Sequence, residues 1–233
     1  NIYHEYMGKR LMRQKRARIN IRIPDYTLGE EIFNAVSHGV GALLSVAALV
    51  YMLFAAAQTG QFVRIVASVI YGSTLITLYS MSTLYHSLHK GKAKRVMRVF
   101  DHCSIYLLIA GTYTPYTMIM LPKALGTPFL IGIWGCAALG VALTSIDLER
   151  FKKFAIVCYV GMGWAVVFAM KPLSEALAPA GIYLMLAGGM AYMLGLIFYG
   201  LKRFRYMHAI WHLFVLMGSL LHFFSISLYV LPA

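Results

Sequence analysis

The sequence is short of charged residues and of cysteine. Charged residues make up 12% of the 233 residues, about half the share that is usual in soluble domains, and this shortage argues against a soluble globular protein. The three cysteines, Cys103, Cys136 and Cys158, stand inside apolar runs without any CxxC spacing. Their number and placement argue against a disulfide framework and against a cysteine-type zinc site.

Hydrophobic residues instead make up 60% of the chain, and the mean hydropathy is +0.70. They gather in seven runs with almost no internal charge, each long enough to cross a bilayer as a helix. The runs are 39–57, 65–86, 99–121, 128–146, 154–170, 180–201 and 207–231, of which the fifth is the weakest. The sequence therefore predicts an all-α, multi-pass integral protein of the cell membrane. We expect a basic arm at 1–24 and a single seven-transmembrane-helix bundle at 25–233.

The basic residues are sorted between alternate loops. Of the 21 lysines and arginines, only Arg64, Lys123 and Lys171 fall on one side, and the other eighteen fall in the N-terminal segment and in alternate loops. The positive-inside rule then predicts a cytoplasmic N-terminus and a C-terminus outside, which requires an odd number of spans. The net charge of +13 is therefore explained by the orientation of the protein in the membrane, and it does not indicate nucleic-acid binding. We expect the arm to bind anionic lipid head groups.

Candidate metal ligands lie at the cytoplasmic ends of three predicted spans. His208 and His212 are one helical turn apart and share a face, His86 closes the second run four residues after Ser82, and Asp101 opens the third. Each histidine alone is more simply an interfacial residue, but ionisable groups at one depth of a bundle usually mark function. Three imidazoles and a water make the open tetrahedral site of catalytic zinc. The residues are therefore compatible with a catalytic Zn²⁺ site here, in which Asp101 would be free to hold the water.

A second polar stripe follows a predicted capping box at Thr27 and Glu30. Glu31, Asn34 and His38 recur at three- and four-residue intervals, so they share one helix face. Spacing alone is equally compatible with an ordinary interfacial turn and with a functional role. Deeper in the last run, His222 lies about 15 Å beyond His212, and we interpret it as a hydrogen-bonded residue of the bundle.

These motifs resemble the three signatures of the progestin and adipoQ receptor family, and most of all its bacterial hemolysin III-like branch. The matching patterns are Glu31-x-x-Asn34-x-x-x-His38, Ser82-x-x-x-His86 followed by Asp101, and His208-x-x-x-His212. The resemblance covers roughly 25–231. It implies a seven-helix fold with a cytoplasmic N-terminus and zinc bound by His86, His208 and His212. It also implies Asp101 near the metal-bound water and Ser82 beside it.

The family includes receptors, enzymes related to alkaline ceramidases, and bacterial members linked to haemolysis and membrane lipid homeostasis. Three functions therefore stay open. The first is a zinc-dependent lipid amidase or esterase, with Asp101 as general base and Ser82 steadying the oxyanion. The second is a non-catalytic membrane sensor with structural zinc. The third is a lytic pore, although no predicted span carries the charged stripe that a conducting path usually needs. Membrane lipids are the expected partners.

Overall fold

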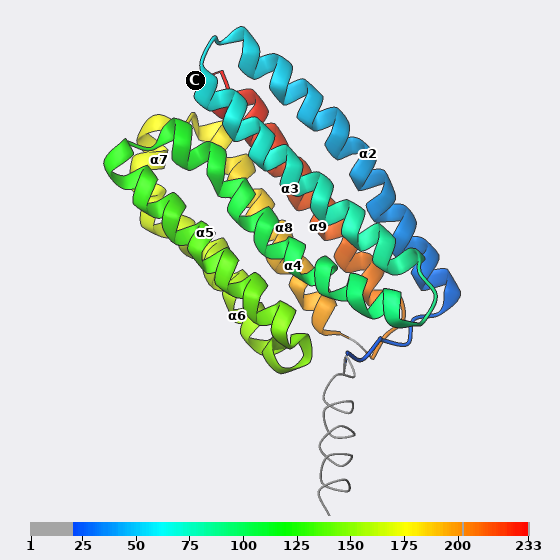
Figure 1. The fold of residues 1–233 in the computed structure, drawn as a ribbon. Helices are drawn as coiled ribbons and strands as arrows, with labels where there is room; N and C mark the ends of the chain where they lie inside the picture. The colour runs from blue at the N-terminus through cyan, green and yellow to red at the C-terminus, as the bar shows by residue number, and fades with distance from the viewer. Residues whose placement is uncertain (1–20, 202, 233) are drawn as a thin grey trace, which may run out of the picture.

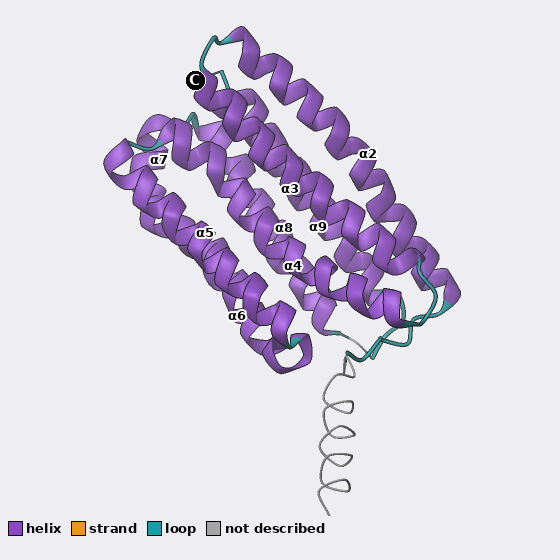
Figure 2. Cartoon of the chain, viewed as in Figure 1, coloured by secondary structure: helices purple, strands orange, loops and turns teal. Residues whose placement is uncertain are grey.

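In a computed structural model, residues 21–201 and 203–232 are described, and within these ranges the chain forms helices and loops without a strand (Figure 2). Most of the predicted basic arm, 1–24, lies outside the described residues. The helices run alongside one another in a bundle, and the start of α2 and the C-terminal end of the chain lie at its opposite ends (Figure 1).

The α-helices follow one another with short connections. In chain order they are α2 (Leu28–Gln58), α3 (Phe62–Ser87), α4 (Lys92–Pro115), α5 (Lys123–Ile146), α6 (Leu148–Trp164), α7 (Met170–Ala176), α8 (Pro179–Gly200) and α9 (Met207–Ser225). Two π-helical segments, Tyr116–Met120 and Ile226–Val230, continue α4 and α9, and a 3₁₀ segment, Ala165–Ala169, joins α6 to α7. The first π segment begins directly after Pro115, whose ring clashes with the preceding turn of a regular helix and removes one backbone hydrogen bond.

Six helical stretches are long and apolar enough to cross a membrane. They are Leu28–Gln58, Phe62–Ser87, Lys123–Ile146, Leu148–Ala176, Pro179–Gly200 and Met207–Val230, and each coincides with one predicted apolar run. The predicted run 99–121 falls in α4 and its π continuation, which is not among the six. Five of the first ten residues of α4 are charged, and these lower its hydropathy. A seventh span there stays a prediction.

The capping box at the start of α2 is confirmed. The Thr27 side chain accepts a hydrogen bond from the Glu30 backbone N–H, and the Glu30 carboxylate accepts one from the Thr27 N–H at 2.8 Å. The other Glu30 oxygen accepts from the Tyr206 N–H at 2.8 Å. This carboxylate therefore fastens the start of α2 to the loop that leads into α9.

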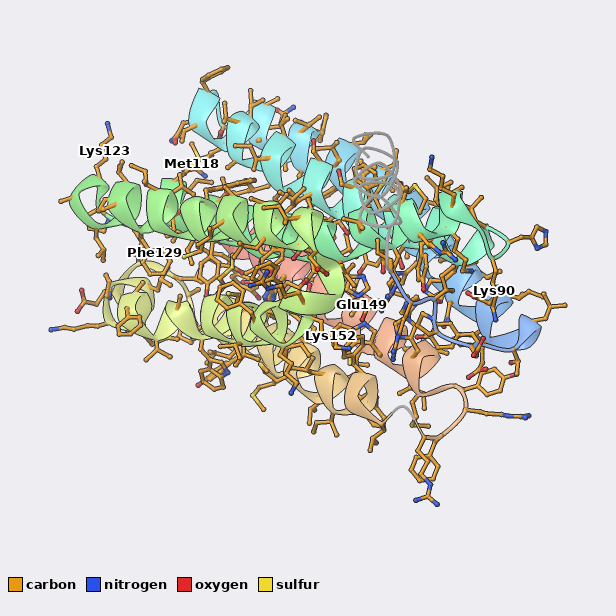
Figure 3. The ribbon with its side chains drawn as sticks, turned by 60° about the horizontal axis from the view of Figure 1, so that its bottom comes forward. Lys90, Met118, Lys123, Phe129, Glu149 and Lys152 are labelled. Atoms are coloured by element: carbon orange, nitrogen blue, oxygen red, sulfur yellow. The ribbon has the colours of Figure 1, made fainter. Side chains whose placement is uncertain are left out.

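The packing order brings distant parts of the sequence together at one end. In Figure 1, α2, α3 and α9 lie on one side, α5 and α6 on the other, and α4 and α8 between them. The Tyr79 hydroxyl of α3 donates to Ser219 Oγ of α9 at 2.7 Å, inside the bundle. Because α3 ends where α9 begins, the predicted ligands of both helices meet. Lys90, after α3, and Lys123, the first residue of α5, lie at opposite ends of the bundle (Figure 3).

Candidate metal centre and its cavity

Three histidines converge at the end of the bundle where α3 ends and α9 starts. One ring nitrogen from each of His86, His208 and His212 lies within 4.8 Å of the other two. The Nε2 atoms of His208 and His212 are 3.1 Å apart. Two nitrogens bound to one tetrahedral zinc at ~2.0–2.1 Å would be roughly 3.4 Å apart. His208 and His212 are therefore close to the spacing that a shared metal ion requires, and His86 is near enough for the group to hold one.

Hydrogen bonds to the Nδ1 atoms of His86 and His212 determine which ring nitrogen is left to bind a metal. His86 Nδ1 lies 2.6 Å from a Glu31 carboxylate oxygen, and His212 Nδ1 lies 3.2 Å from the Asn34 carbonyl oxygen. Both oxygens only accept, so both Nδ1 atoms carry the proton and both Nε2 atoms keep a lone pair. His86 Nε2 is buried and has no hydrogen-bond partner among the described residues. A metal would supply the missing partner, in the carboxylate–histidine–metal arrangement common in zinc sites.

Lys94, which the sequence analysis counted only as a loop charge, supports this arrangement. Its ammonium donates to the second Glu31 oxygen at 2.7 Å and to the Leu88 carbonyl at 2.9 Å. The residue is only 2% exposed. Glu31 is thus held between His86 and a buried cation, and its carboxylate cannot turn away. Nothing in the spacing along the chain separates Lys94 from its exposed neighbour Lys92.

The segment before α2 covers the end of the bundle where the three histidines meet. The sequence analysis did not predict this contact. The Tyr26 ring stacks on His208 with 5.1 Å between ring centroids, and it lies 5.8 Å from the His86 ring. Burial there raises the pKa of the Tyr26 hydroxyl. Beside it, the Lys90 ammonium donates to Asp25 and lowers the pKa of that carboxyl. These contacts hold the segment against the histidines.

The polar stripe of α2 faces the three histidines along its length. Asn34 is fully buried, and its carbonyl is the His212 partner described above. The His38 ring lies parallel to the His212 ring at 3.6 Å between centroids. Both His38 nitrogens lack a hydrogen-bond partner in the described part of the chain, but neither belongs to the three-nitrogen group. The stripe is therefore an interior contact surface of the site and not an ordinary interfacial turn.

Ser82 and Asp101 line the same cavity as His208 and His212. Ser82 is 1% exposed, and its hydroxyl has no hydrogen-bond partner among the described residues. Asp101 lies outside the three-nitrogen group, with a carboxylate oxygen 3.4 Å from His102 Nδ1. The structure thus places both residues on the lining of the cavity that two of the histidines also line. Their predicted catalytic roles stay predictions.

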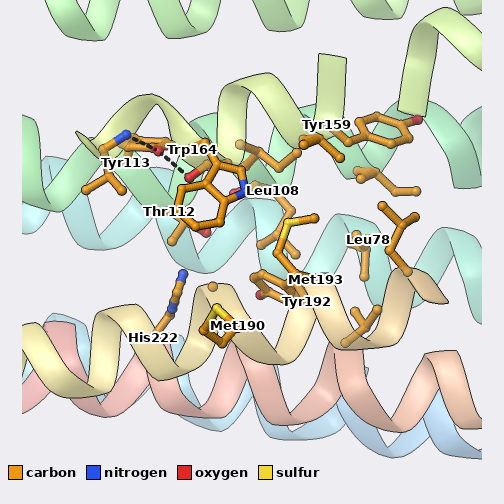
Figure 4. Close-up of a pocket in the computed structure, with 18 of the residues that line it drawn as sticks. Leu78, Leu108, Thr112, Tyr113, Tyr159, Trp164, Met190, Tyr192, Met193 and His222 are labelled. Atoms are coloured by element: carbon orange, nitrogen blue, oxygen red, sulfur yellow. Dashed lines mark hydrogen bonds between the residues drawn. The ribbon is translucent and has the colours of Figure 1, made fainter. Parts of the chain in front are cut away.

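The cavity has a volume of about 220 Å³ and runs through the bundle from His208 and His212 to His222. Its walls are largely apolar and come mostly from α3, α4, α6, α8 and α9, with single residues from α2, α5 and α7; Figure 4 shows part of its length. Three lining residues of α6 and α8, Trp164, Leu186 and Met190, are 40–51% exposed, so the cavity opens sideways between these helices. An apolar chain could enter there from a surrounding bilayer.

At the far end of the cavity, one expectation from the sequence is wrong. His222 is 8% exposed, yet no hydrogen bond joins its ring to another described residue. It is therefore not a hydrogen-bonded bundle residue, because the polar groups around it are bonded elsewhere.

Comparisons with known proteins show which family this chain is similar to. A family model described as Haemolysin-III related matches residues 26–223. Hemolysin-3 of Bacillus cereus is 45% identical over 203 residues, which cover 87% of this chain and 93% of that protein. The Hemolysin-3 homolog of Bacillus subtilis (strain 168) is 42% identical over 204 residues, 88% and 96% of the two chains. The human Monocyte to macrophage differentiation factor is 30% identical over 169 residues, 69% of each.

Proposed function

The chain belongs to the haemolysin-III-related family and is an integral multi-pass membrane protein, and on this premise we propose that it is a zinc-dependent lipid hydrolase. The reaction is cleavage of an amide or ester bond in a membrane lipid, as part of membrane lipid homeostasis. The observation that supports it best is the three-histidine group at the end of a long apolar cavity, in which His86 Nε2 is buried and has no hydrogen-bond partner among the described residues.

His86, His208 and His212 are the residues that would hold the zinc ion. When bound, zinc lowers the pKa of a water molecule to about 7 and polarises a carbonyl group. Glu31 holds His86 with its Nδ1 proton directed at the carboxylate, and the Asn34 carbonyl does the same for His212. Both rings are thereby oriented before a metal or substrate arrives, so little free energy is spent on ordering them.

The remaining groups have roles that follow from their hydrogen-bonding capacity. The Asp101 carboxylate takes the proton of the attacking water, and the same group then returns it to the leaving amine or alcohol. The Ser82 hydroxyl, which has no other described partner, donates to the oxyanion as the carbonyl becomes tetrahedral. The apolar walls hold the acyl chain and keep bulk water from the reacting bond.

We also propose the orientation in the bilayer that the basic loops predict. Seven long helices cross the membrane, α4 with its π continuation being one of them, with the N-terminus in the cytoplasm and the C-terminus outside. The metal centre then lies near the inner leaflet, and the basic arm binds anionic head groups. The sideways opening near Met190 lies at the middle of α8, so an acyl chain enters closer to the bilayer centre than its head group.

The test is hydrolysis by purified protein in lipid nanodiscs. Release of fatty acid from ceramide-like and ester lipids is measured by mass spectrometry, together with zinc content, for wild type and His208→Ala. The wild-type protein should hydrolyse the lipid and carry about one zinc per chain. The His208→Ala protein should lose both the hydrolysis and the zinc. Equal rates of lipid hydrolysis by the two proteins would contradict the proposal.

A structural zinc in a non-catalytic membrane sensor is the second candidate. It is favoured by the way one site ties together α2, α3, α4 and α9, through Glu31, His86, Lys94 and His212. In that case zinc removal lowers the melting temperature, while Asp101→Asn leaves the cellular phenotype intact. Loss of the phenotype in a stably folded Asp101→Asn protein would instead favour the hydrolase.

A further inference from the structure

The far end of the cavity contains one polar group that is available to a ligand. A Cβ on Gly188 would come within 2.1 Å of His222 Nδ1, so this nitrogen is sealed against the backbone of α8. Nδ1 is buried and unpartnered among the described residues. His222 lines the cavity, and Figure 4 shows its ring pointing toward the side on which Thr112 lies. The nitrogen left facing the cavity is therefore Nε2.

The neighbouring polar groups already have partners. The Thr112 hydroxyl donates to the Leu108 carbonyl at 2.7 Å. The Tyr192 hydroxyl is 2.9 Å from Ser219 Oγ, and its ring lies edge-on to His222 with 5.4 Å between centroids. A buried polar group without a partner is costly in an apolar environment. A ligand that reached Nε2 would therefore gain a hydrogen bond that the protein itself does not make.

We propose that His222 is a hydrogen-bonding subsite for a hydroxyl group carried in the middle of a long acyl chain. The subsite lies about 15 Å along α9 from His212, so the head of such a chain can lie at the metal centre while its middle passes His222. The cavity surface between the two ends is largely apolar, which suits methylene groups on either side of the hydroxyl.

A neutral hydroxyl fits this subsite better than a charged group. A charge buried among apolar walls would need a counter-ion, and the described residues named around His222 offer none. A hydroxyl can both donate and accept, so it can pair with Nε2 in either imidazole tautomer. The subsite would thus discriminate between acyl chains by one hydrogen bond placed at a fixed distance from the head.

This inference rests on the proposed lipid substrate, but its test measures binding and not turnover. Purified full-length protein in nanodiscs is titrated with stearic acid and with monohydroxystearic acids whose hydroxyl is moved along the chain, in competition with a fluorescent fatty acid. Wild type should prefer one mid-chain isomer over stearic acid by about fivefold, which is the net value of one hydrogen bond. The isomers with a hydroxyl near either end should bind no better than stearic acid.

Two variants accompany the wild type. His222→Phe keeps a ring of similar size and should bind all the acids equally, while Met193→Leu, an apolar change in the same wall, should keep the preference. Equal binding of all acids by wild type, or a preference that survives in His222→Phe, would overturn the inference. Hydrolysis without a hydroxyl preference would overturn only this subsite, whereas the preference without hydrolysis would overturn only the proposed reaction.

Discussion

His86 Nδ1 lies 2.6 Å from the Glu31 carboxylate, a contact between residues 55 positions apart in the sequence. The first comes from the last turn of α3 and the second from the first turn of α2. Because the carboxylate holds the Nδ1 proton, the Nε2 lone pair of His86 points into the three-histidine group. A motif residue on one helix therefore sets the protonation of a candidate ligand on another.

Replacing Glu31 by glutamine should weaken zinc binding. The neutral amide is a weaker acceptor and can present its NH₂ group to His86, so the ring loses its fixed orientation. Supporting partners of this kind typically change metal affinity by about 10- to 100-fold, which a chelator competition titration would measure. Glu175→Gln, an exposed carboxylate in α7, is the control and should bind zinc like wild type. Unchanged affinity in Glu31→Gln would contradict the role given to this carboxylate.

Replacing Lys94 by methionine should destabilise the fold. Removing one partner of a buried ion pair leaves the other without compensation, and the usual cost is about 3 kcal/mol. The melting temperature of the detergent-purified Lys94→Met protein should be clearly lower than that of wild type. Lys92→Met removes an exposed lysine two residues earlier, and its free energy of unfolding should stay within about 0.5 kcal/mol of the wild-type value. If both variants melted alike, the buried pair would have no energetic importance.

Ser82→Ala should separate activity from stability. Its hydroxyl makes no hydrogen bond with the described residues, so its loss should change the unfolding free energy by less than about 1 kcal/mol. Loss of an oxyanion donor lowers kcat by about 10²- to 10³-fold. Ser68→Ala removes a second buried and unpartnered hydroxyl of α3 that does not line the cavity, and it should keep full activity. An active Ser82→Ala protein would remove this serine from the reaction.

Alanine at Gly188 should be poorly tolerated, while alanine at the adjacent Gly189 should be accepted. A Cβ at Gly188 would overlap the His222 ring, whereas a Cβ at Gly189 would meet nothing within 4 Å. Overpacking typically costs about 1–3 kcal/mol. Gly189 is half-buried but has free space at its Cβ position, so alanine there should stabilise the helix by up to about 1 kcal/mol. The melting temperatures of the two variants should therefore move in opposite directions. A stable Gly188→Ala protein would show that His222 can move freely.

Much of the site could be predicted from the sequence because its residues fall into short repeated spacings. The four-residue intervals of Ser82 with His86 and of His208 with His212 place each pair on one helix face. The sorting of lysine and arginine between loops predicts that these helix ends share a side of the membrane. Spacing and charge were therefore sufficient to name the candidate metal-binding group and the polar stripe of α2.

Lys94, Tyr26 and His222 could not be interpreted in the same way. Each depends on contacts with another helix or with the segment before α2, and spacing along one helix carries no information about such contacts. Lys94 and Lys92 have the same local pattern, yet only Lys94 is turned toward Glu31. Local pattern suggested a bonded His222, but the partners near it are already used by Tyr79, Tyr192 and their neighbours.

The sequence by itself determined the membrane class, the helical spans that its apolar runs predict, and the identity of three candidate zinc ligands. These follow from hydrophobicity and helical periodicity, which are local properties of the chain. The tertiary structure decided which nitrogen of each supported ring is free, which lysine is buried, and where the cavity opens and ends. These depend on how α2, α3, α4, α8 and α9 pack, because a hydrogen bond or a cavity wall between helices exists only once their faces are brought together.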